Sequence, residues 1–220
     1  MTWAVERSVG SAADFHARAV PAGTGRQVWV LTVDRPALVL GSTQGAAVVD
    51  HEAVTVAGVE VVRRRSGGGA VLLEPGGTVW VDVVLPADDP LADEDVGRAF
   101  HWLGGAWAEG LAALGLDARV HRGPLQTTAW SHLVCFGGLG PGEVTVDGAK
   151  AVGMSQRRTR ASARFQCAVP LRWDADRLLR LLALTRSERT AAASDLLGAV
   201  VELSEPADAV VDAFLAALPG

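Results

Sequence analysis

The stretch VWVDVVL, residues 79–85, decides the fold class because it is the clearest strand in the chain. Its odd-numbered positions are all aliphatic, and Trp80, Asp82 and Val84 alternate with them. Alternation with a period of two is typical of a strand that lies with one face on a core. We therefore expect a sheet that is covered by other elements on one side.

Further β-rich runs lie on both sides of this strand. Residues 29–33 and 37–40 are separated by Asp34-Arg35-Pro36, a turn signal, and we expect these two runs to form a hairpin. Asp147-Gly148 is a strong hairpin signal, and it would join a strand at 144–146 to a second arm at 149–156. Other strands are expected at residues 59–63, 71–73, 118–121 and 164–169.

Helices are expected in three parts of the chain. Residues 93–114 carry apolar side chains at spacings of three and four, acidic residues in the first turn and Gly115 after the end, which predicts an amphipathic helix. A short helix is expected over residues 47–56, and apolar stripes beginning at Leu178 and Val210 predict a helical C-terminal part. This order of elements indicates one α+β domain over residues 1–220, with a mixed, largely antiparallel sheet packed with helices.

The composition argues against several classes of protein. The 220 residues are 49% hydrophobic with a net charge of -5, which opposes a whole-surface attraction to nucleic acid or anionic lipid. Apolar runs stay far below the roughly 18 residues that a membrane span needs, so we expect a soluble cytoplasmic protein. Cys135 and Cys167 have no second cysteine or histidine at metal-ligand spacing, so we expect free thiols and no metal site.

Lys150 is the only lysine, against 19 arginines. The chain also lacks Ile, Asn and Tyr, residues with AT-rich codons, which suggests a GC-rich coding sequence. Under that bias, a position that needs only positive charge drifts to arginine. A surviving lysine therefore indicates a site shaped around a compact ammonium group, and a chance residue on the surface is the alternative.

The motif RRRSGGGA, residues 63–70, lies between two expected strands. Consecutive glycines let backbone N–H groups approach a ligand closely, and the arginines supply positive charge for a carboxylate or phosphate. We interpret the motif as an anion-binding loop, with a flexible loop and a solvated charge cluster as the alternative. It has no Gly-Lys-Ser/Thr ending, and the chain has no G-x-G-x-x-G that opens a helix, so P-loop and dinucleotide folds are excluded.

The motif DGAKAVGMSQ, residues 147–156, places Lys150 on the returning arm of the expected hairpin. A lysine three residues before Gly153 can face a ligand that the glycine admits, whereas an edge strand with solvated charges is the alternative. Arg157, Arg158 and Arg160 follow at once. A nucleic-acid patch is disfavoured, because no aromatic residues are interleaved and the chain is acidic.

Three motifs, in this order and spacing, resemble the lipoate branch of the superfamily of lipoate-protein ligase A, octanoyltransferases and biotin ligases: RPALVLGSTQ (35–44), RRRSGGGAV (63–71) and DGAKAVGMSQ (147–156). The resemblance covers most of the chain. It implies a mixed sheet with helices, an acyl tunnel near the glycines, and Lys150 contacting the reacting carbonyl. It implies formation of an amide between an octanoyl or lipoyl group and a lysine of a lipoyl-carrier domain. The substrate-binding residues that it implies are Arg65, Ser66, Gly67, Gly68, Gly69, Ala70, Gly153 and Ser155.

Two chemistries occur in this family. The ligase branch makes an acyl-adenylate and needs ATP and Mg, with charge stabilisation by Lys150 and backbone N–H groups and no protein nucleophile. The octanoyltransferase branch moves the acyl group from a carrier thioester to a cysteine and then to the lysine of a second carrier, with no tightly bound cofactor.

Cys135-Phe136 stands fifteen residues before Lys150, which is similar to the Cys-Phe pair of one octanoyltransferase subfamily. A cationic lysine near the thiol would favour the thiolate, so we favour Cys135 as the nucleophile. The alternative is that Cys135 is a small buried hydrophobic residue in a strand.

Several positions depart from the family pattern. Leu72-Leu73 and Gly76-Gly77 stand where His-Asp and Gly-Asn are frequent, and Cys167-Ala168 replaces a His-Gly pair. An Asn-Asp-Leu stretch before the lysine and a separate C-terminal domain are also missing. These departures weaken the ligase more than the transferase, and they leave open a homologue that binds lipoate or carrier without catalysis. A biotin ligase is a third alternative, disfavoured because the loop lacks an alternating Gly-Arg-Gly-Arg pattern.

The expected partners are lipoyl-carrier domains and acyl carrier protein, bound by a monomer. The cluster of Arg157, Arg158, Arg160 and Arg164 would dock an acidic carrier domain or the phosphate of its prosthetic arm. We expect no nucleic-acid or membrane partner.

Overall fold

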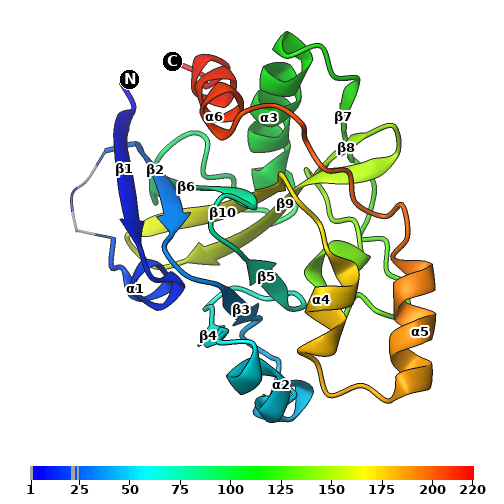
Figure 1. Ribbon diagram of the computed structural model, residues 1–220. Coiled ribbons are helices and arrows are strands. Elements are labelled where there is room, and N and C mark those ends of the chain that lie inside the picture. Colours follow the sequence, from blue (N-terminus) through cyan, green and yellow to red (C-terminus); the bar gives the residue numbers. More distant parts are fainter. Residues whose placement is uncertain (1, 21–22, 24) are drawn as a thin grey trace.

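The computed structural model describes residues 2–20, 23 and 25–220, which form two sheets with helices around them (Figure 1). The larger sheet has seven strands in the order β1-β2-β6-β10-β9-β8-β7, and the smaller one has three in the order β4-β3-β5. In the larger sheet β1 and β2 are parallel, and the other neighbouring pairs are antiparallel. The α+β class with a mixed, largely antiparallel sheet is therefore confirmed. The strands are β1 (Ala4–Gly10), β2 (Gln27–Val33), β3 (Ala37–Leu40), β4 (Glu60–Arg63), β5 (Val71–Leu73), β6 (Thr78–Pro86), β7 (Ala118–Val120), β8 (Val144–Val146), β9 (Ala149–Arg158) and β10 (Ser162–Pro170).

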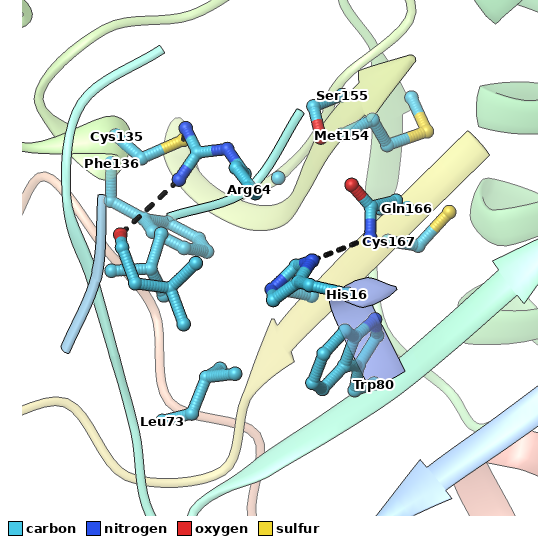
Figure 2. A pocket seen from close by; sticks show the side chains of 14 residues that line it. His16, Arg64, Leu73, Trp80, Cys135, Phe136, Met154, Ser155, Gln166 and Cys167 are labelled. Atoms are coloured by element: carbon cyan, nitrogen blue, oxygen red, sulfur yellow. Dashed lines mark hydrogen bonds between the residues drawn. The ribbon is translucent and has the colours of Figure 1, made fainter. Parts of the chain in front are cut away.

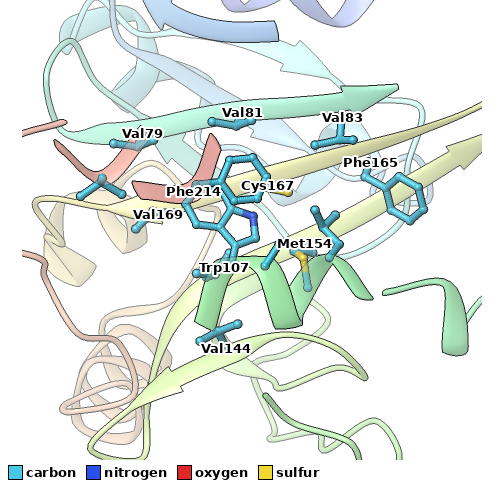
Figure 3. Close-up of a cluster of buried hydrophobic side chains, with 14 of the residues drawn as sticks. Val79, Val81, Val83, Trp107, Val144, Met154, Phe165, Cys167, Val169 and Phe214 are labelled. Atoms are coloured by element: carbon cyan, nitrogen blue, oxygen red, sulfur yellow. The ribbon is translucent and has the colours of Figure 1, made fainter. Parts of the chain in front are cut away.

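Two helices cover one face of the larger sheet. The rings of Trp107 on α3 and Phe214 on α6 stack with centroids 4.0 Å apart, and they pack beneath the valines of β6 (Figure 3). In the described residues, no helix has the length and hydrophobicity that a bilayer crossing requires. The helices are α1 (Ala12–Ala17), α2 (His51–Val56), α3 (His101–Ala113), α4 (Ala175–Arg180), α5 (Arg186–Asp195) and α6 (Ala207–Ala216), with 3-10 turns at Ala46–Val48, Arg98–Phe100 and Cys135–Gly137.

Strand β6 is buried on both faces, so the expectation of a sheet covered on one side is wrong. Val81 and Val83 face the α3 and α6 core, whereas Trp80 and Val84 pack with α1 and the smaller sheet. Asp82 is also fully buried, and it is compatible with that position because it pairs with Arg164 of β10 at 2.6 Å.

The hairpin expected between residues 29–33 and 37–40 is wrong, although both strands exist. Strand β2 pairs with β1 and β6, whereas β3 lies between β4 and β5 in the smaller sheet. The chain passes from one sheet to the other at Asp34, whose N–H group donates to the carbonyl of Gly10 at 2.9 Å. A turn signal marks where the chain bends, but it does not identify the strand that pairs next. By contrast, Asp147 and Gly148 both have positive φ and join β8 to β9 as a hairpin, as expected.

The helix expected at 93–114 begins later, at His101, after the 3-10 turn Arg98–Phe100. The Asp93 side chain accepts a hydrogen bond from the N–H group of Asp95 at 2.8 Å, and the Asp95 side chain accepts one from the N–H group of Arg98 at 2.9 Å. Such local hydrogen bonds from side chain to backbone favour turns over helix. The helix expected at 47–56 is likewise divided, because Asp50 caps α2 by accepting the N–H bond of Ala53.

Candidate functional site

Two adjoining pockets lie where β9 and β10 meet the Gly67–Gly69 loop. The first, here the apolar pocket, encloses about 450 Å³ with its open mouth included, and Leu73, Trp80 and Phe136 lie in its wall (Figure 2). The second, here the open groove, encloses about 1080 Å³ up to open solvent and is bordered by the glycine loop and Lys150. Cys135, Met154 and Ser155 line both spaces. These three residues therefore form the boundary between the two pockets.

Backbone contacts attach Cys135 to the glycine loop. The N–H group of Ala70 donates to Leu133 O at 2.7 Å, and that of Cys135 donates to Ala70 O at 3.0 Å. A Cβ at Gly69 would lie 2.5 Å from the backbone carbon of Val134, so the close approach requires glycine. Cys135 opens a 3-10 turn, not a strand, and is half-buried.

The buried side chain of Gln44 supports the same segment. Its Nε2 donates to His132 O and Leu133 O at 3.0 and 3.1 Å, and its Oε1 accepts from the N–H group of Gly41 at 2.9 Å. Gln44 therefore connects the end of β3 to the segment before the cysteine. Gln44 is the last residue of the motif RPALVLGSTQ (35–44), and no role for its side chain was predicted from the sequence.

Arg64, rather than Arg65, faces the thiol. The Arg64 guanidinium is buried, donates to the carbonyls of Gly67 and Gly69 at 2.7 and 2.8 Å, and places Nη2 4.0 Å from Cys135 Sγ. Arg65 is exposed, and neither pocket includes it in its wall. The Arg64 guanidinium is therefore a buried cation next to the Cys135 thiol, a position for which no cation was predicted from the sequence other than Lys150.

Lys150 is buried in the wall of the open groove. Its Nζ lies 2.7 Å from Glu143 Oε2 and donates to the carbonyls of Cys135 and Gly138 at 3.2 and 3.0 Å. Nζ also lies 5.0 Å from the centre of the Phe136 ring. The lysine is 4% exposed, which excludes the alternative of a chance residue on the surface.

Glu143 is the partner that the sequence analysis missed. Its Oε1 accepts from the N–H group of Met154 at 2.9 Å, and its Oε2 accepts from that of Gly140 at 2.7 Å. The carboxylate thus joins the loop before β8 to β9 while it pairs with the lysine. A Cβ at Gly153 would lie 3.0 Å from Phe136 Cζ and 3.3 Å from Lys150 Cε, so this glycine makes room for the lysine stem and the ring.

A chain of polar side chains crosses the apolar pocket. Ser155 Oγ lies 2.9 Å from Ser66 Oγ, and Ser66 Oγ donates to Gln166 Oε1 at 3.1 Å. Gln166 Nε2 lies 3.2 Å from His16 Nδ1 on α1 (Figure 2). Burial lowers the pKa of His16 to about 3, helped by the charges of Arg164 and Arg64.

Three of the positions that depart from the family pattern, Leu73, Cys167 and Ala168, line the apolar pocket. None of the three carries the charged or imidazole side chain of an aspartate or a histidine. Burial raises the pKa of the Cys167 thiol far above its usual range, which keeps this thiol protonated. Of the two free cysteines, Cys135 is therefore the one suited to act as a nucleophile.

The four arginines expected to dock a carrier lie in different environments. Arg164 is 5% exposed and pairs with Asp82, so its inclusion in a docking surface is wrong. Arg158 donates to the backbone carbonyls of Asp93 and Glu94. Arg160 is exposed, and Arg157 is half-buried with its pKa lowered by burial and by the charges of Arg65 and Arg164.

Known proteins resemble the chain in sequence and in fold. The family model of the lipoyl protein ligase A/B catalytic domain matches residues 11–218. The octanoyltransferase LipM of Kyrpidia tusciae is 31% identical over 201 residues, which cover 84% of this chain and 73% of that protein. The octanoyltransferase LipM of Carboxydothermus hydrogenoformans is 32% identical over 152 residues, which cover 69% of this chain and 55% of that protein.

Among solved structures, a bipartite lipoate protein ligase from Thermoplasma acidophilum superposes with a TM-score of 0.78 and 19% identity, covering 99% of this chain and 82% of that chain. A putative lipoate protein ligase from the same organism, with bound lipoic acid, gives a TM-score of 0.72 and 19% identity, covering 98% of this chain and 82% of that chain. These two similarities concern the fold.

Proposed function

Because the chain belongs to the lipoyl protein ligase A/B catalytic domain family, we propose that it transfers an octanoyl group to a lysine of a lipoyl-carrier protein through Cys135. The relatives that are 31% and 32% identical over the aligned residues are octanoyltransferases, which favours this chemistry over ATP-dependent ligation. One observation carries the proposal: Cys135 lies at the boundary between the apolar pocket and the open groove. Residues 1–220 act as one catalytic domain in this proposal.

In the first half-reaction the acyl chain occupies the apolar pocket, and its thioester carbonyl lies at Cys135. The Cys135 sulfur, next to the Arg64 guanidinium, attacks that carbonyl, the thioester bond to the carrier breaks, and the carrier thiol leaves with the proton that Cys135 loses. In the second half-reaction a lysine amine of the lipoyl carrier attacks the acyl-cysteine from the open groove. An amide forms, the Cys135 thiol is released, and neither step consumes ATP.

Lys150 and the glycine loop are proposed to stabilise the negative charge that develops on the carbonyl oxygen in both steps. Lys150 Nζ donates to the carbonyl of Cys135, and residues 67–69 border the same groove. Ser66 and Ser155 are proposed to hold the loop against β9 through their 2.9 Å contact. Lys150 is buried and paired with Glu143, so it acts from a fixed position.

Carrier proteins are proposed to dock beside the mouth of the open groove, on Arg157 and Arg160 at the outer end of the β9–β10 hairpin. Gln156, the neighbour of Arg157, lines the groove, so a carrier bound there is close to Cys135. Arginine contacts with acidic carriers would speed association more than they strengthen binding.

The test is intact-protein mass after incubation with octanoyl-acyl carrier protein, followed by addition of an apo lipoyl domain. We expect one octanoyl group on wild type, which then moves to the lipoyl domain. Cys135→Ser should abolish both events. Cys167→Ser is the matched control, because the Cys167 thiol is buried in the core around Trp107 and should not react, so this variant should retain transfer.

Two outcomes would select another function. If Cys135→Ser still modifies the lipoyl domain when lipoate, ATP and Mg are supplied, the protein is a ligase. A mass gain on neither the protein nor the lipoyl domain, with carrier binding preserved, would indicate a homologue without catalysis.

A further inference from the structure

His16 presents an unpartnered ring nitrogen inside the apolar pocket. The residue is 9% exposed, and Nε2 has no hydrogen-bond partner among the described residues. The ring lies against Trp80 with centroids 4.8 Å apart. Figure 2 shows His16 and Trp80 on the side of the pocket opposite Cys135 and Phe136. His16 therefore lies away from the proposed nucleophile, toward the far end of the pocket.

The hydrogen bonds around His16 determine its tautomer. Ser66 Oγ donates to Gln166 Oε1, so the amide nitrogen of Gln166 faces the histidine. An amide nitrogen only donates, so His16 Nδ1 accepts and Nε2 carries the proton. With its pKa near 3 the ring is neutral at physiological pH, and Nε2–H is a donor without an acceptor.

Most of the accessible wall of the pocket is apolar. Leu73, Cys167 and Ala168 lie in the same pocket, and none of them presents a side-chain acceptor comparable to an oxygen. A saturated chain that fills the pocket would displace water and leave Nε2–H unpaired. Leaving a buried donor unpaired weakens binding, on the order of tenfold, relative to a ligand that supplies an acceptor.

We propose that His16 is a specificity-determining residue, which donates a hydrogen bond from Nε2 to an oxygen or sulfur atom on the distal part of the acyl chain. The inference rests on the proposed function, because it takes the apolar pocket to hold that chain. It adds that an acyl chain with a distal acceptor is bound several-fold more tightly than a saturated chain of equal length. The octanoyl group remains a substrate.

The test measures the binding of free acids by calorimetry, so it does not depend on turnover. Octanoate is compared with 6-oxooctanoate and 7-oxooctanoate, which have the same length, and with lipoate, which carries distal sulfur. Wild type should bind at least one acceptor-bearing acid about fivefold more tightly than octanoate. His16→Leu should abolish this ratio, and His16→Gln, which keeps a donor, should retain part of it.

The ratio of affinities separates a role in specificity from a structural role, because damage to the pocket would weaken the binding of all four acids alike. Equal affinities of wild type for octanoate and every acceptor-bearing acid would overturn the inference, as would an unchanged ratio in His16→Leu. Both results leave the proposed acyl pocket intact, since octanoate binds. If none of the acids binds to wild type, the proposed pocket is wrong and the inference with it.

Discussion

Two buried ion pairs lie in the larger sheet, and they differ in what their cations face. Arg164 of β10 pairs with Asp82, and its remaining N–H groups donate to the carbonyls of Phe15 and Arg18. Lys150 of β9 pairs with Glu143 at 2.7 Å, but it also borders the open groove. The two cations are 5% and 4% exposed, so burial does not distinguish them.

The difference teaches that access to a pocket, rather than burial of a charge, makes a cation a candidate for a functional role. The planar fork of Arg164 spans a carboxylate and two backbone carbonyls at once, which suits a residue that holds α1 on the sheet. A compact ammonium group such as that of Lys150 leaves space beside it for a substrate. Replacing Lys150 should therefore affect mainly catalysis, and replacing Arg164 should affect mainly stability.

The largest expected effect is on catalysis at the lysine. Lys150→Met should lower kcat/KM for octanoyl transfer by about 100- to 1000-fold, because it removes the positive charge that we propose to stabilise the developing oxyanion. The amount of octanoylated lipoyl domain is measured by mass and divided by the amount of folded enzyme. Since a lone Glu143 would destabilise the fold, Lys150→Met/Glu143→Gln is made in parallel and should remain inactive.

The corresponding control is Arg164→Met. The activity per folded molecule of this variant should stay within about tenfold of the wild-type activity, because Arg164 borders neither pocket. If both variants lose activity equally, the two ion pairs do not differ as we describe.

The second expected effect, similar in free energy to the first, concerns stability. Arg164→Met should lower the free energy of unfolding by about 3–5 kcal/mol, because it leaves the fully buried Asp82 without its cation. Burial already raises the pKa of Asp82, whereas hydrogen bonds with Arg164, Trp80 and Gln166 favour the charged carboxylate. The double variant Arg164→Met/Asp82→Leu should recover most of the lost free energy of unfolding, which is measured by urea unfolding. A change below about 1 kcal/mol in Arg164→Met would mean that this pair does not stabilise the fold.

The smallest effect extends the comparison to exposed cations. Arg160→Ala should lower kcat/KM for the carrier substrate by about two- to threefold at low salt, and the difference should vanish at high salt. Transfer from a small octanoyl thioester should be unchanged. Arg119→Ala serves as a control because Arg119 is exposed and already paired with Asp117 at 2.8 Å. Equal losses in both variants would argue against docking on the hairpin.

The sequence predicted most strands, because alternation and turn residues are local properties. It did not predict which strands pair: the Asp34-Arg35-Pro36 signal is equally compatible with a hairpin and with a passage between sheets. The start of α3 was also misplaced, since side-chain bonds of Asp93 and Asp95 favour turns in a segment with helical periodicity.

The candidate site was predicted where residues are close in sequence. The glycine loop and Lys150 lie in recognisable motifs, and both border the open groove. His16 could not be found in this way, because its partner Gln166 is 150 residues away. Glu143 precedes Lys150 by only seven residues, yet a single carboxylate in a loop carries no signal of its partner. Arg164 was grouped with exposed arginines because sequence alone does not report burial.

The crossing of two backbones at Gly41 has a consequence for genetic variation. A Cβ at this position would overlap the carbonyl oxygen of Gly68, a backbone atom that no side-chain rearrangement removes. Even alanine at position 41 would thus displace the loop that borders Cys135. In a library of all single substitutions, position 41 should behave as an essential site although its residue has no functional group.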